Sequence, residues 1–224
     1  MSVKTAVYAV NVTPLMTDDG LFEKALAAVT PARREKAARY RKKEDAARSL
    51  GAELLLRYAF LRAGEPFPKQ LALSANGKPF APDSPLHFNL SHSGKWVVCI
   101  VSGDEVGCDV EEIDPAHVSI AFSVFTEQEQ ARLVGVGKKE QTHRFFRLWT
   151  LKESYQKASG RGMSLPMSSF SVELGTPSRI HTAPNTAFAE YTDLPGYACA
   201  VCQLSGGETP PLCVVSVHEL LRTR

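Results

Sequence analysis

The sequence predicts a protein of mixed α/β (α+β) class with two similar halves. Its 224 residues suit one large domain or two small ones, and 44% hydrophobic with 22% charged residues is ordinary for a globular protein. Each half begins with a strand-like segment, continues through helical segments and ends in strands. This shared order is compatible with an ancient duplication, with the two halves joined near residues 101–106.

Composition narrows the classes of function and of partner. Residues 1–10 have no long apolar run and no cleavage pattern, and no stretch reaches the roughly 18 apolar residues of a membrane span. The net charge of +2 gives no general nucleic-acid signature. We therefore expect neither a membrane nor a nucleic acid as a partner.

Five cysteines are present, and four lie in apolar, strand-like surroundings, which favours reduced thiols in a cytoplasmic protein. Cys199 and Cys202 form a lone C-x-x-C pair whose side chains would face opposite sides of a strand. No second ligand pair accompanies them, so we expect no zinc site.

The first half is predicted to contain a strand at residues 5–12 and two helices. Thr30 and Pro31 are typical of a helix start. A basic run begins there, formed by Arg33, Arg34, Lys36, Arg39, Arg41, Lys42 and Lys43. This run fits either a solvated helix face or an electrostatic seat for a polyanion. The second helix is predicted to end at Gly64 and to bury one stripe, formed by Leu50, Leu54, Tyr58 and Leu61.

A hairpin and two further strands are predicted to complete the first half. Asn76-Gly77 is a strong hairpin signal. Residues 87–101 are predicted to form two strands joined by the polar turn Ser91-His92-Ser93-Gly94. The serines and the histidine have two interpretations, because they serve either as turn residues or as hydrogen-bond donors that face a phosphate.

The segment Val106-Gly107-Cys108-Asp109-Val110-Glu111 opens the second half. As a strand it places Cys108 and Val110 on one face and Asp109 and Glu111 on the other. The two carboxylates would be roughly 6.5–7 Å apart at the backbone, close enough to converge on one cation. An exposed polar strand face is the alternative.

The main helix of the second half is predicted around residues 145–157. Trp149, Glu153 and Lys157 share one stripe, and the helix ends at the glycines that follow it. Glu153 and Lys157 fit either a surface ion pair or a site that holds a metal and a phosphate. Before this helix, Thr126 and Glu129 fit a capping box, so we assign Glu129 to a helix start rather than to chemistry. After Pro166 we expect strands at residues 169–174, 187–191, 197–204 and 212–217.

Taken together, these motifs resemble the Sfp-type 4'-phosphopantetheinyl transferases. The family pattern is Gly-x-Asp-x-Glu followed about forty residues later by Trp-x-x-Lys-Glu-x-x-x-Lys. Here these are Gly107-Cys108-Asp109-Val110-Glu111 and Trp149-Thr150-Leu151-Lys152-Glu153-Ser154-Tyr155-Gln156-Lys157. The likeness also covers residues 33–36, 43–48, 88–94, 197–202 and 215–221, and so extends over nearly the whole chain. Cys108 and Arg33 depart from residues common in the family, without affecting the acidic residues.

The resemblance implies a fold and a reaction. The fold would have two pseudo-symmetric halves, residues 1–103 and 104–224, with coenzyme A in the cleft between them and with one chain as the active unit. The first half would bind the adenosine and 3'-phosphate end, and the second would carry the metal and the catalytic residues. The family moves the 4'-phosphopantetheine arm of coenzyme A onto a serine of an apo acyl or peptidyl carrier protein and releases 3',5'-ADP, which is holo-[acyl-carrier-protein] synthase activity.

The resemblance also implies a role for each motif residue. Mg²⁺, with Mn²⁺ as an alternative ion, would be held by Asp109, Glu111 and Glu153. Lys157 would lie on the pyrophosphate, and catalysis would depend on Glu153, Lys157 and Asp109. Glu153 or a metal-activated water would take the proton of the serine. Coenzyme A would be bound by Arg33, Lys36, Arg48, Lys78, Pro79, Ser91, His92 and Lys157, with Lys152 as a further contact.

Two other functions fit the same motifs. One is a metal-dependent phosphohydrolase that cleaves coenzyme A with water as the acceptor. The other is a non-catalytic coenzyme A-binding partner of carrier proteins. For a transferase, the carrier proteins of fatty acid, polyketide and nonribosomal peptide synthesis all remain candidates as acceptors, because residues 118–140 carry no readable code for one of them.

Overall fold

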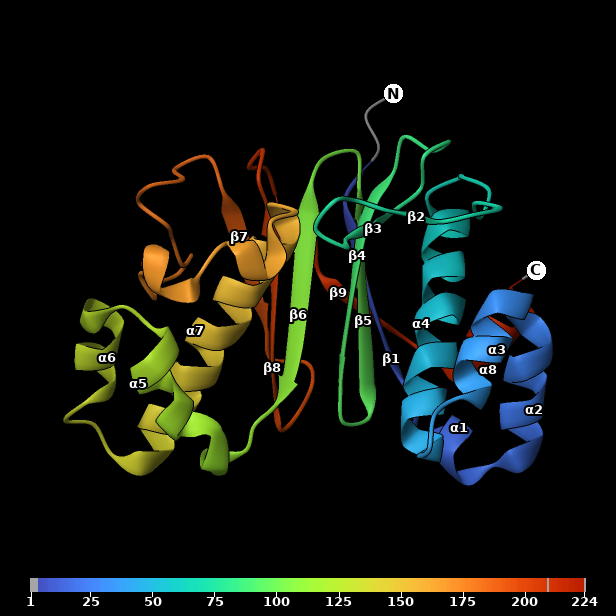
Figure 1. Ribbon diagram of the computed structural model, residues 1–224, viewed down its shortest axis with the longest axis horizontal. Coiled ribbons are helices and arrows are strands. Elements are labelled where there is room, and N and C mark those ends of the chain that lie inside the picture. The colour runs from blue at the N-terminus through green and yellow to red at the C-terminus, as the bar shows by residue number, and fades with distance from the viewer. Residues whose placement is uncertain (1–3, 209, 224) are drawn as a thin grey trace.

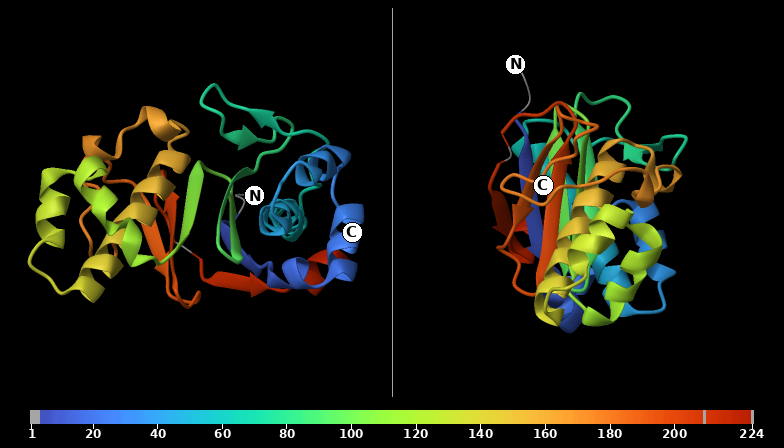
Figure 2. Two further views of the ribbon diagram at one scale, coloured as in Figure 1. Left: turned by 60° about the horizontal axis from the view of Figure 1, so that its bottom comes forward. Right: turned by 90° about the vertical axis from the view of Figure 1, so that its left-hand side faces the viewer.

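The chain folds into four layers, in which two sheets lie between two groups of helices (Figures 1 and 2). The structure is a computed structural model that describes residues 4–208 and 210–223. Residues 1–3, which are part of the segment judged for a signal peptide, lie outside the described residues. Among the residues it describes, no helix is both long and apolar enough to cross a membrane.

The first half follows the predicted order of strand, helices and strands. Its elements are β1 (Ala6–Asn11), α1 (Thr13–Thr17), α2 (Asp19–Ala28), α3 (Pro31–Ala38), α4 (Lys43–Arg62), β2 (Ala72–Leu73), β3 (Pro79–Phe80), β4 (His87–Ser93) and β5 (Trp96–Ser102). Thr30 caps α3 through its side chain, with Pro31 at the first helical position, as predicted. Leu61 is 52% exposed, so its assignment to the buried stripe of α4 was wrong.

The second half contains the long helix that carries the Trp-x-x-Lys-Glu motif. Its elements are β6 (Val106–Glu112), the 3₁₀ turn η1 (Pro115–Ile120), α5 (Ala121–Val124), α6 (Glu127–Leu133), α7 (Lys138–Ala158), the turns η2 (Gly162–Ser164) and η3 (Met167–Ser169), β7 (Ala187–Tyr191), β8 (Tyr197–Gln203), β9 (Leu212–Val215) and α8 (Val217–Arg222). The capping box predicted at Thr126 and Glu129 is present. The strand expected at residues 169–174 is not formed, and only an isolated bridge joins Glu173 to Arg179.

The two halves share one sheet topology. In the first, β1 pairs antiparallel with β5, which pairs antiparallel with β4. In the second, β6 pairs antiparallel with β8, which pairs antiparallel with β7. In each half the first strand therefore lies beside the last, and the middle strand lies beyond the last. The predicted two-half α/β architecture is confirmed.

The end of the chain departs from the predicted division at residue 104. Strand β9 pairs parallel with β1 and extends the first sheet to the order β4-β5-β1-β9. Helix α8 then packs into the core of the first half through Val217 and Leu220. The Tyr58 hydroxyl on α4 donates to Glu219 at 2.9 Å. Residues 212–222 therefore belong structurally to the first half.

Three apolar clusters fill the spaces between adjacent layers. One lies between the first sheet and its helices, and another between the second sheet and α5–α7. The third lies between the two sheets and includes Val7, Val98, Cys108 and Cys199. Cys202 packs in the cluster beneath α7 instead, so the side chains of Cys199 and Cys202 face opposite sides of β8, as expected.

The edge strands β4 and β6 lie side by side and are joined by side chains rather than by a backbone ladder. The Asn89 amide oxygen accepts from the Cys108 N–H at 2.9 Å, the Ser91 hydroxyl from the Val110 N–H at 3.4 Å, and the Ser93 hydroxyl from the Glu112 N–H at 3.1 Å. Ser91–Ser93 are therefore part of strand β4, and the predicted turn lies later, at residues 94–95.

Candidate active site

The acidic residues of β6 face helix α7 because strand alternation separates them from their apolar neighbours. Cys108 and Val110 enter the core between the sheets, while Asp109 and Glu111 lie on the opposite face. Gly107 permits a close approach, since a Cβ there would lie 2.1 Å from the Ser154 carbonyl oxygen of α7. A glycine at this position lets the helix backbone lie directly against the strand.

Asp109 and Lys157 form the centre of the site. The Lys157 ammonium lies 2.6 Å from Asp109 Oδ1, 3.9 Å from Glu153 Oε2 and 3.3 Å from the Ser91 hydroxyl. Ser91 donates to the same Asp109 oxygen at 2.8 Å. Burial alone would lower the pKa of Lys157, but the Asp109 carboxylate, and then Glu153, raises it above its ordinary value. The ammonium therefore stays charged at neutral pH.

The other two carboxylates lie in the field of Asp109. Burial, and then the charge of Asp109, raises the pKa of Glu111 to about 7. Burial and Asp109 also raise the pKa of Glu153, while Lys157 opposes that shift. Burial is the larger cause of both shifts, and the contribution of Asp109 shows that an additional cation would stabilise the charged forms of these acids.

Asp109 provides a specific indication for such a cation. Its second oxygen, Oδ2, is buried and has no hydrogen-bond partner within the described chain. A buried carboxylate oxygen without a partner is costly and is a common mark of an ion that binds there. Carboxylates are also the oxygen ligands that Mg²⁺ takes. The residues present therefore fit a divalent ion, although within the described residues no three acidic, histidine or cysteine side chains are grouped closely enough to form a ready-made cage.

Positive charges from both halves gather around His92. Desolvation of the ring lowers the pKa of His92, and nearby positive charges lower it further: those of Arg48, Lys157 and Lys36. The imidazole is therefore neutral near pH 7, with one N–H available to donate. This grouping joins Lys36 of the basic run and Arg48 of α4 to Lys157 and favours the polyanion seat over a solvated face.

Arg33 and Arg48, which were predicted to bind coenzyme A, are held in place by residues of α4 and by Gly94 in the turn after β4. Arg33 donates through Nε to Glu53 at 3.2 Å and through Nη1 to Ser49 at 3.2 Å. Arg48 donates to the Gly94 carbonyl at 2.8 Å and pairs with Asp45. Glu53 itself is buried, and sequence reasoning had not identified it. These contacts occupy only part of each guanidinium, whose five N–H groups leave donors for a phosphate.

The Lys152 side chain is buried in the core of the second half, contrary to the prediction that it contacts coenzyme A. Its side chain is 0% exposed, and its ammonium contacts Glu129 at 2.8 Å, the Met167 carbonyl at 2.8 Å and the Phe170 carbonyl at 2.5 Å. These three acceptors use all three N–H groups of the lysine. Glu129 is likewise 0% exposed, so besides capping α6 it is the partner of a buried ion pair.

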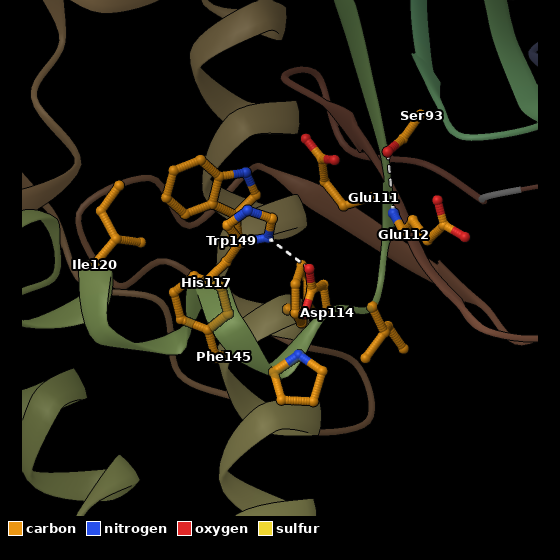
Figure 3. A pocket seen from close by; sticks show the side chains of 11 residues that line it. Ser93, Glu111, Glu112, Asp114, His117, Ile120, Phe145 and Trp149 are labelled. Carbon is orange, nitrogen blue, oxygen red and sulfur yellow. Dashed lines mark hydrogen bonds and ion pairs between the residues drawn. The ribbon is translucent and has the colours of Figure 1, made fainter. Parts of the chain in front are cut away.

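A pocket of about 610 Å³ opens beside Glu111. Figure 3 shows Glu111 and Trp149 at this pocket, with Ile120, His117 and Phe145 farther along its wall. Ser93 contributes from β4, so both halves of the chain line it. Sequence reasoning did not find this pocket, because its apolar residues come from η1, from α7 and from Ile113 just after β6, and share no local motif.

Lys78 and Pro79 lie where the hairpin of the first half meets the second half. Pro79 begins β3 and is half-buried. The Lys78 ammonium donates to Glu105 at 2.6 Å and to the Val106 carbonyl at 3.1 Å. The Lys78 side chain is therefore directed at protein atoms of the second half.

Comparison with known proteins identifies the family of the chain. Residues 16–104 match the family model described as 4'-phosphopantetheinyl transferase, N-terminal, and residues 105–202 match the 4'-phosphopantetheinyl transferase superfamily model. The chain is 36% identical over 207 residues to 4'-phosphopantetheinyl transferase Sfp of Bacillus subtilis (strain 168), covering 89% of this chain and 92% of the relative. It is 37% identical over 177 residues to 4'-phosphopantetheinyl transferase gsp of Aneurinibacillus migulanus, covering 76% and 74%.

A further relative matches a shorter span of the chain. Over 99 residues the chain is 41% identical to 4'-phosphopantetheinyl transferase AcpT of Escherichia coli (strain K12), covering 42% of this chain and 50% of the relative. The motifs of β6 and α7, the shared topology of the halves and these similarities converge on one conclusion: the chain belongs to the 4'-phosphopantetheinyl transferase superfamily.

Proposed function

We propose that this protein transfers the 4'-phosphopantetheine arm of coenzyme A to a serine of an apo carrier protein and releases 3',5'-ADP, with Mg²⁺ as cofactor. The observation that carries this proposal is the arrangement of Asp109, Lys157 and Glu153. A charged ammonium lies between two carboxylates, next to a buried carboxylate oxygen that has no partner. Such a site suits a reaction in which phosphate charge must be bound and redistributed.

In the proposed reaction the serine hydroxyl oxygen forms a bond to the β-phosphorus, and the bond from that phosphorus to the bridging oxygen of ADP breaks. Lys157 neutralises the charge that develops on the departing oxygen. Glu153 accepts the serine proton as the general base. Ser91 holds Asp109 in place through their 2.8 Å hydrogen bond.

Asp109, Glu111 and Glu153 would hold the Mg²⁺ ion, with Mn²⁺ as a substitute. When bound, the ion supplies electrophilic stabilisation of the pyrophosphate. Arg33, Lys36, Arg48 and His92 would bind the 3'-phosphate end of coenzyme A from the first half. Pro79 would line the site next to Lys78, whose ammonium donates to protein atoms. To donate to coenzyme A, the Ser91 hydroxyl would have to turn away from Asp109, to which it donates in the free protein.

We further propose that the protein acts as a monomer in the cytoplasm. One chain supplies residues from both sides of the cleft, including Ser91 and Lys157 at 3.3 Å from each other. The buried cysteines Cys99, Cys108, Cys199 and Cys202 are all unpaired thiols, which fits a reducing compartment.

The test is intact-mass spectrometry of an apo acyl carrier protein and an apo peptidyl carrier domain after incubation with this protein, coenzyme A and Mg²⁺. We expect each accepted carrier to gain one phosphopantetheine, and chelation of the metal to abolish the gain. Asp109→Asn and Glu153→Gln should lower the rate at least a hundredfold. Glu140→Gln, an exposed position on the same helix α7, is the matched control and should retain the wild-type rate.

Other outcomes would reject the proposal in different ways. Free phosphopantetheine in place of a modified carrier would indicate the hydrolase. Coenzyme A binding with neither product would indicate the non-catalytic partner. Undiminished transfer by Asp109→Asn would show that the site has been assigned wrongly.

A further inference from the structure

The hairpin of the first half reaches across to the second half at one defined point. We call residues 74–78, between β2 and β3, the hairpin tip. The tip is held by the bonds Gly77 N–H to Ser74 O and Ser74 N–H to Lys78 O, both 2.9 Å, and Gly77 has φ = +81°. In Figure 1 the hairpin extends from the first half toward β6 and the C-terminal end of α7.

Lys78 places its ammonium at the junction of three segments. It donates to Glu105 Oε2 at 2.6 Å on the β5–β6 connection, to the Val106 carbonyl at 3.1 Å at the start of β6, and to the Ala158 carbonyl at 3.3 Å at the end of α7. The side chain is only 14% exposed. Because these three contacts use the three ammonium N–H groups, little donor capacity remains for a phosphate.

Asn76 makes a second contact with the same end of the helix. Its side-chain amide donates to the Gly160 carbonyl at 3.0 Å. The last carbonyls of a helix have no intrahelical partner and carry the negative end of the helix dipole. The Lys78 ammonium therefore satisfies the Ala158 carbonyl at the end of α7, and the Asn76 amide binds the carbonyl two residues beyond it.

The clamped turn is the one that carries the catalytic lysine. Lys157 directly precedes Ala158, and its ammonium lies 2.6 Å from Asp109. Gly107 of β6 also lies against the backbone of Ala158, since a Cβ there would be 2.4 Å from the Ala158 nitrogen. The last turn of α7 is thus in contact with both β6 and the hairpin tip.

We propose that Asn76 and Lys78 are positioning residues, which clamp the C-terminal turn of α7 and so hold Lys157 against Asp109. Lys78 then matters for transfer through this clamp and not through a bond from its ammonium to a phosphate of coenzyme A. The inference rests on the proposed function for the choice of ligand, whereas the clamp itself is a property of the free protein.

The first measurement is amide hydrogen exchange of the free protein, without coenzyme A. In Lys78→Met and in Asn76→Asp, the amides of Ser159 and Gly160, which close the last turn of α7, should exchange about tenfold faster than in the wild type. Lys24→Met, an exposed lysine on α2, is the charge-matched control and should leave these rates unchanged. Unchanged exchange in both hairpin variants would overturn the proposal.

The second measurement compares coenzyme A with 3'-dephospho-coenzyme A as donors. If Lys78 acts by positioning, Lys78→Met lowers kcat for both donors by the same factor, and the ratio of their KM values stays that of the wild type. A selective loss with coenzyme A would place the ammonium on the 3'-phosphate and refute the clamp. Faster exchange in a protein that transfers nothing would leave the clamp standing and reject the proposed function instead.

Discussion

The buried pair formed by Lys152 and Glu129 gives a sharp test of whether the motif lysine is structural. Replacing Lys152 by Met keeps a long apolar stem but removes the ammonium, leaving Glu129 charged at a site that is 0% exposed. Removing one partner of a buried ion pair costs about 3–5 kcal/mol. Glu129 keeps donors from the Thr126 backbone at 3.0 Å and the Val172 backbone at 2.8 Å, so we expect the lower end of this range.

A loss of about 3 kcal/mol is a large part of the 5–15 kcal/mol that stabilises a typical domain, yet it leaves the protein folded. Urea unfolding measures this loss, with exposed Lys139→Met on the same helix as the control, for which we expect a change within about 0.5 kcal/mol. The double variant Lys152→Met with Glu129→Met removes both charges and should recover about 1–3 kcal/mol relative to the sum of the single changes.

The same variants also separate a core role from a ligand contact. Calorimetry should give a coenzyme A affinity within about twofold of the wild type for folded Lys152→Met, because its neighbours are protein carbonyls and aromatic rings. Wild-type stability together with a tenfold weaker affinity would refute this reasoning. It would show instead that the lysine leaves the core to reach the ligand.

Three other predictions concern the site itself. Gly107→Ala should lower the free energy of unfolding by about 1–3 kcal/mol, measured in urea, because the new Cβ would lie 2.1 Å from a backbone oxygen of α7. The shifted pKa of Glu111 predicts that the stability of the protein depends on pH in the absence of Mg²⁺. Burial and Asp109 raise this pKa from 4.5 to about 7, so between these values the folded protein holds a proton that the unfolded chain has released. Its contribution to stability should therefore be present below about pH 4.5 and be lost as the pH rises to about 7, and Glu111→Gln should remove this slope in urea titrations. Replacing Arg33, Lys36 and His92 together by Ala should weaken coenzyme A binding at least tenfold by calorimetry, and unchanged binding would show that the polyanion seat lies elsewhere.

Sequence patterns anticipated the elements whose period is clear. The alternation in residues 106–111 placed Asp109 on a face opposite Cys108, and the helical stripe of Glu153 and Lys157 brought both side chains to that face. Such patterns specify which residues share a side, because strand and helix periods are fixed by backbone geometry. The pairing of Lys157 with Asp109 at 2.6 Å followed only once helix and strand were placed together.

Long-range partners were not readable from the sequence. Lys152 belongs to the Trp-x-x-Lys-Glu motif and directly precedes Glu153, so the sequence alone suggests a ligand contact. Only the positions of Glu129 and of residues 167–170 show that Lys152 points into the core. Leu61 continues a helical stripe, but at the end of α4 it is Ala59 and Phe60 that face the core, so the Leu61 side chain is exposed. Both errors arise because burial depends on what packs against a face, while the sequence pattern reports only that a face exists.

The polar residues of β4 explain why the two sheets stay separate and do not join into one. Two edge strands that lie side by side would ordinarily pair backbone to backbone, about 4.8 Å apart, and close the gap. Here Asn89, Ser91 and Ser93, spaced by two, bind the outward N–H groups of β6 through their side chains, so the strands stay farther apart. Ser91 adds a hydrogen bond to Asp109 from the same hydroxyl. The alternating Asn-x-Ser-x-Ser pattern therefore provides hydrogen-bond partners for the backbone N–H groups of β6, keeps the two sheets separate and orients Asp109. The prediction of a turn at residues 91–94 could not reveal these roles, because each depends on β6.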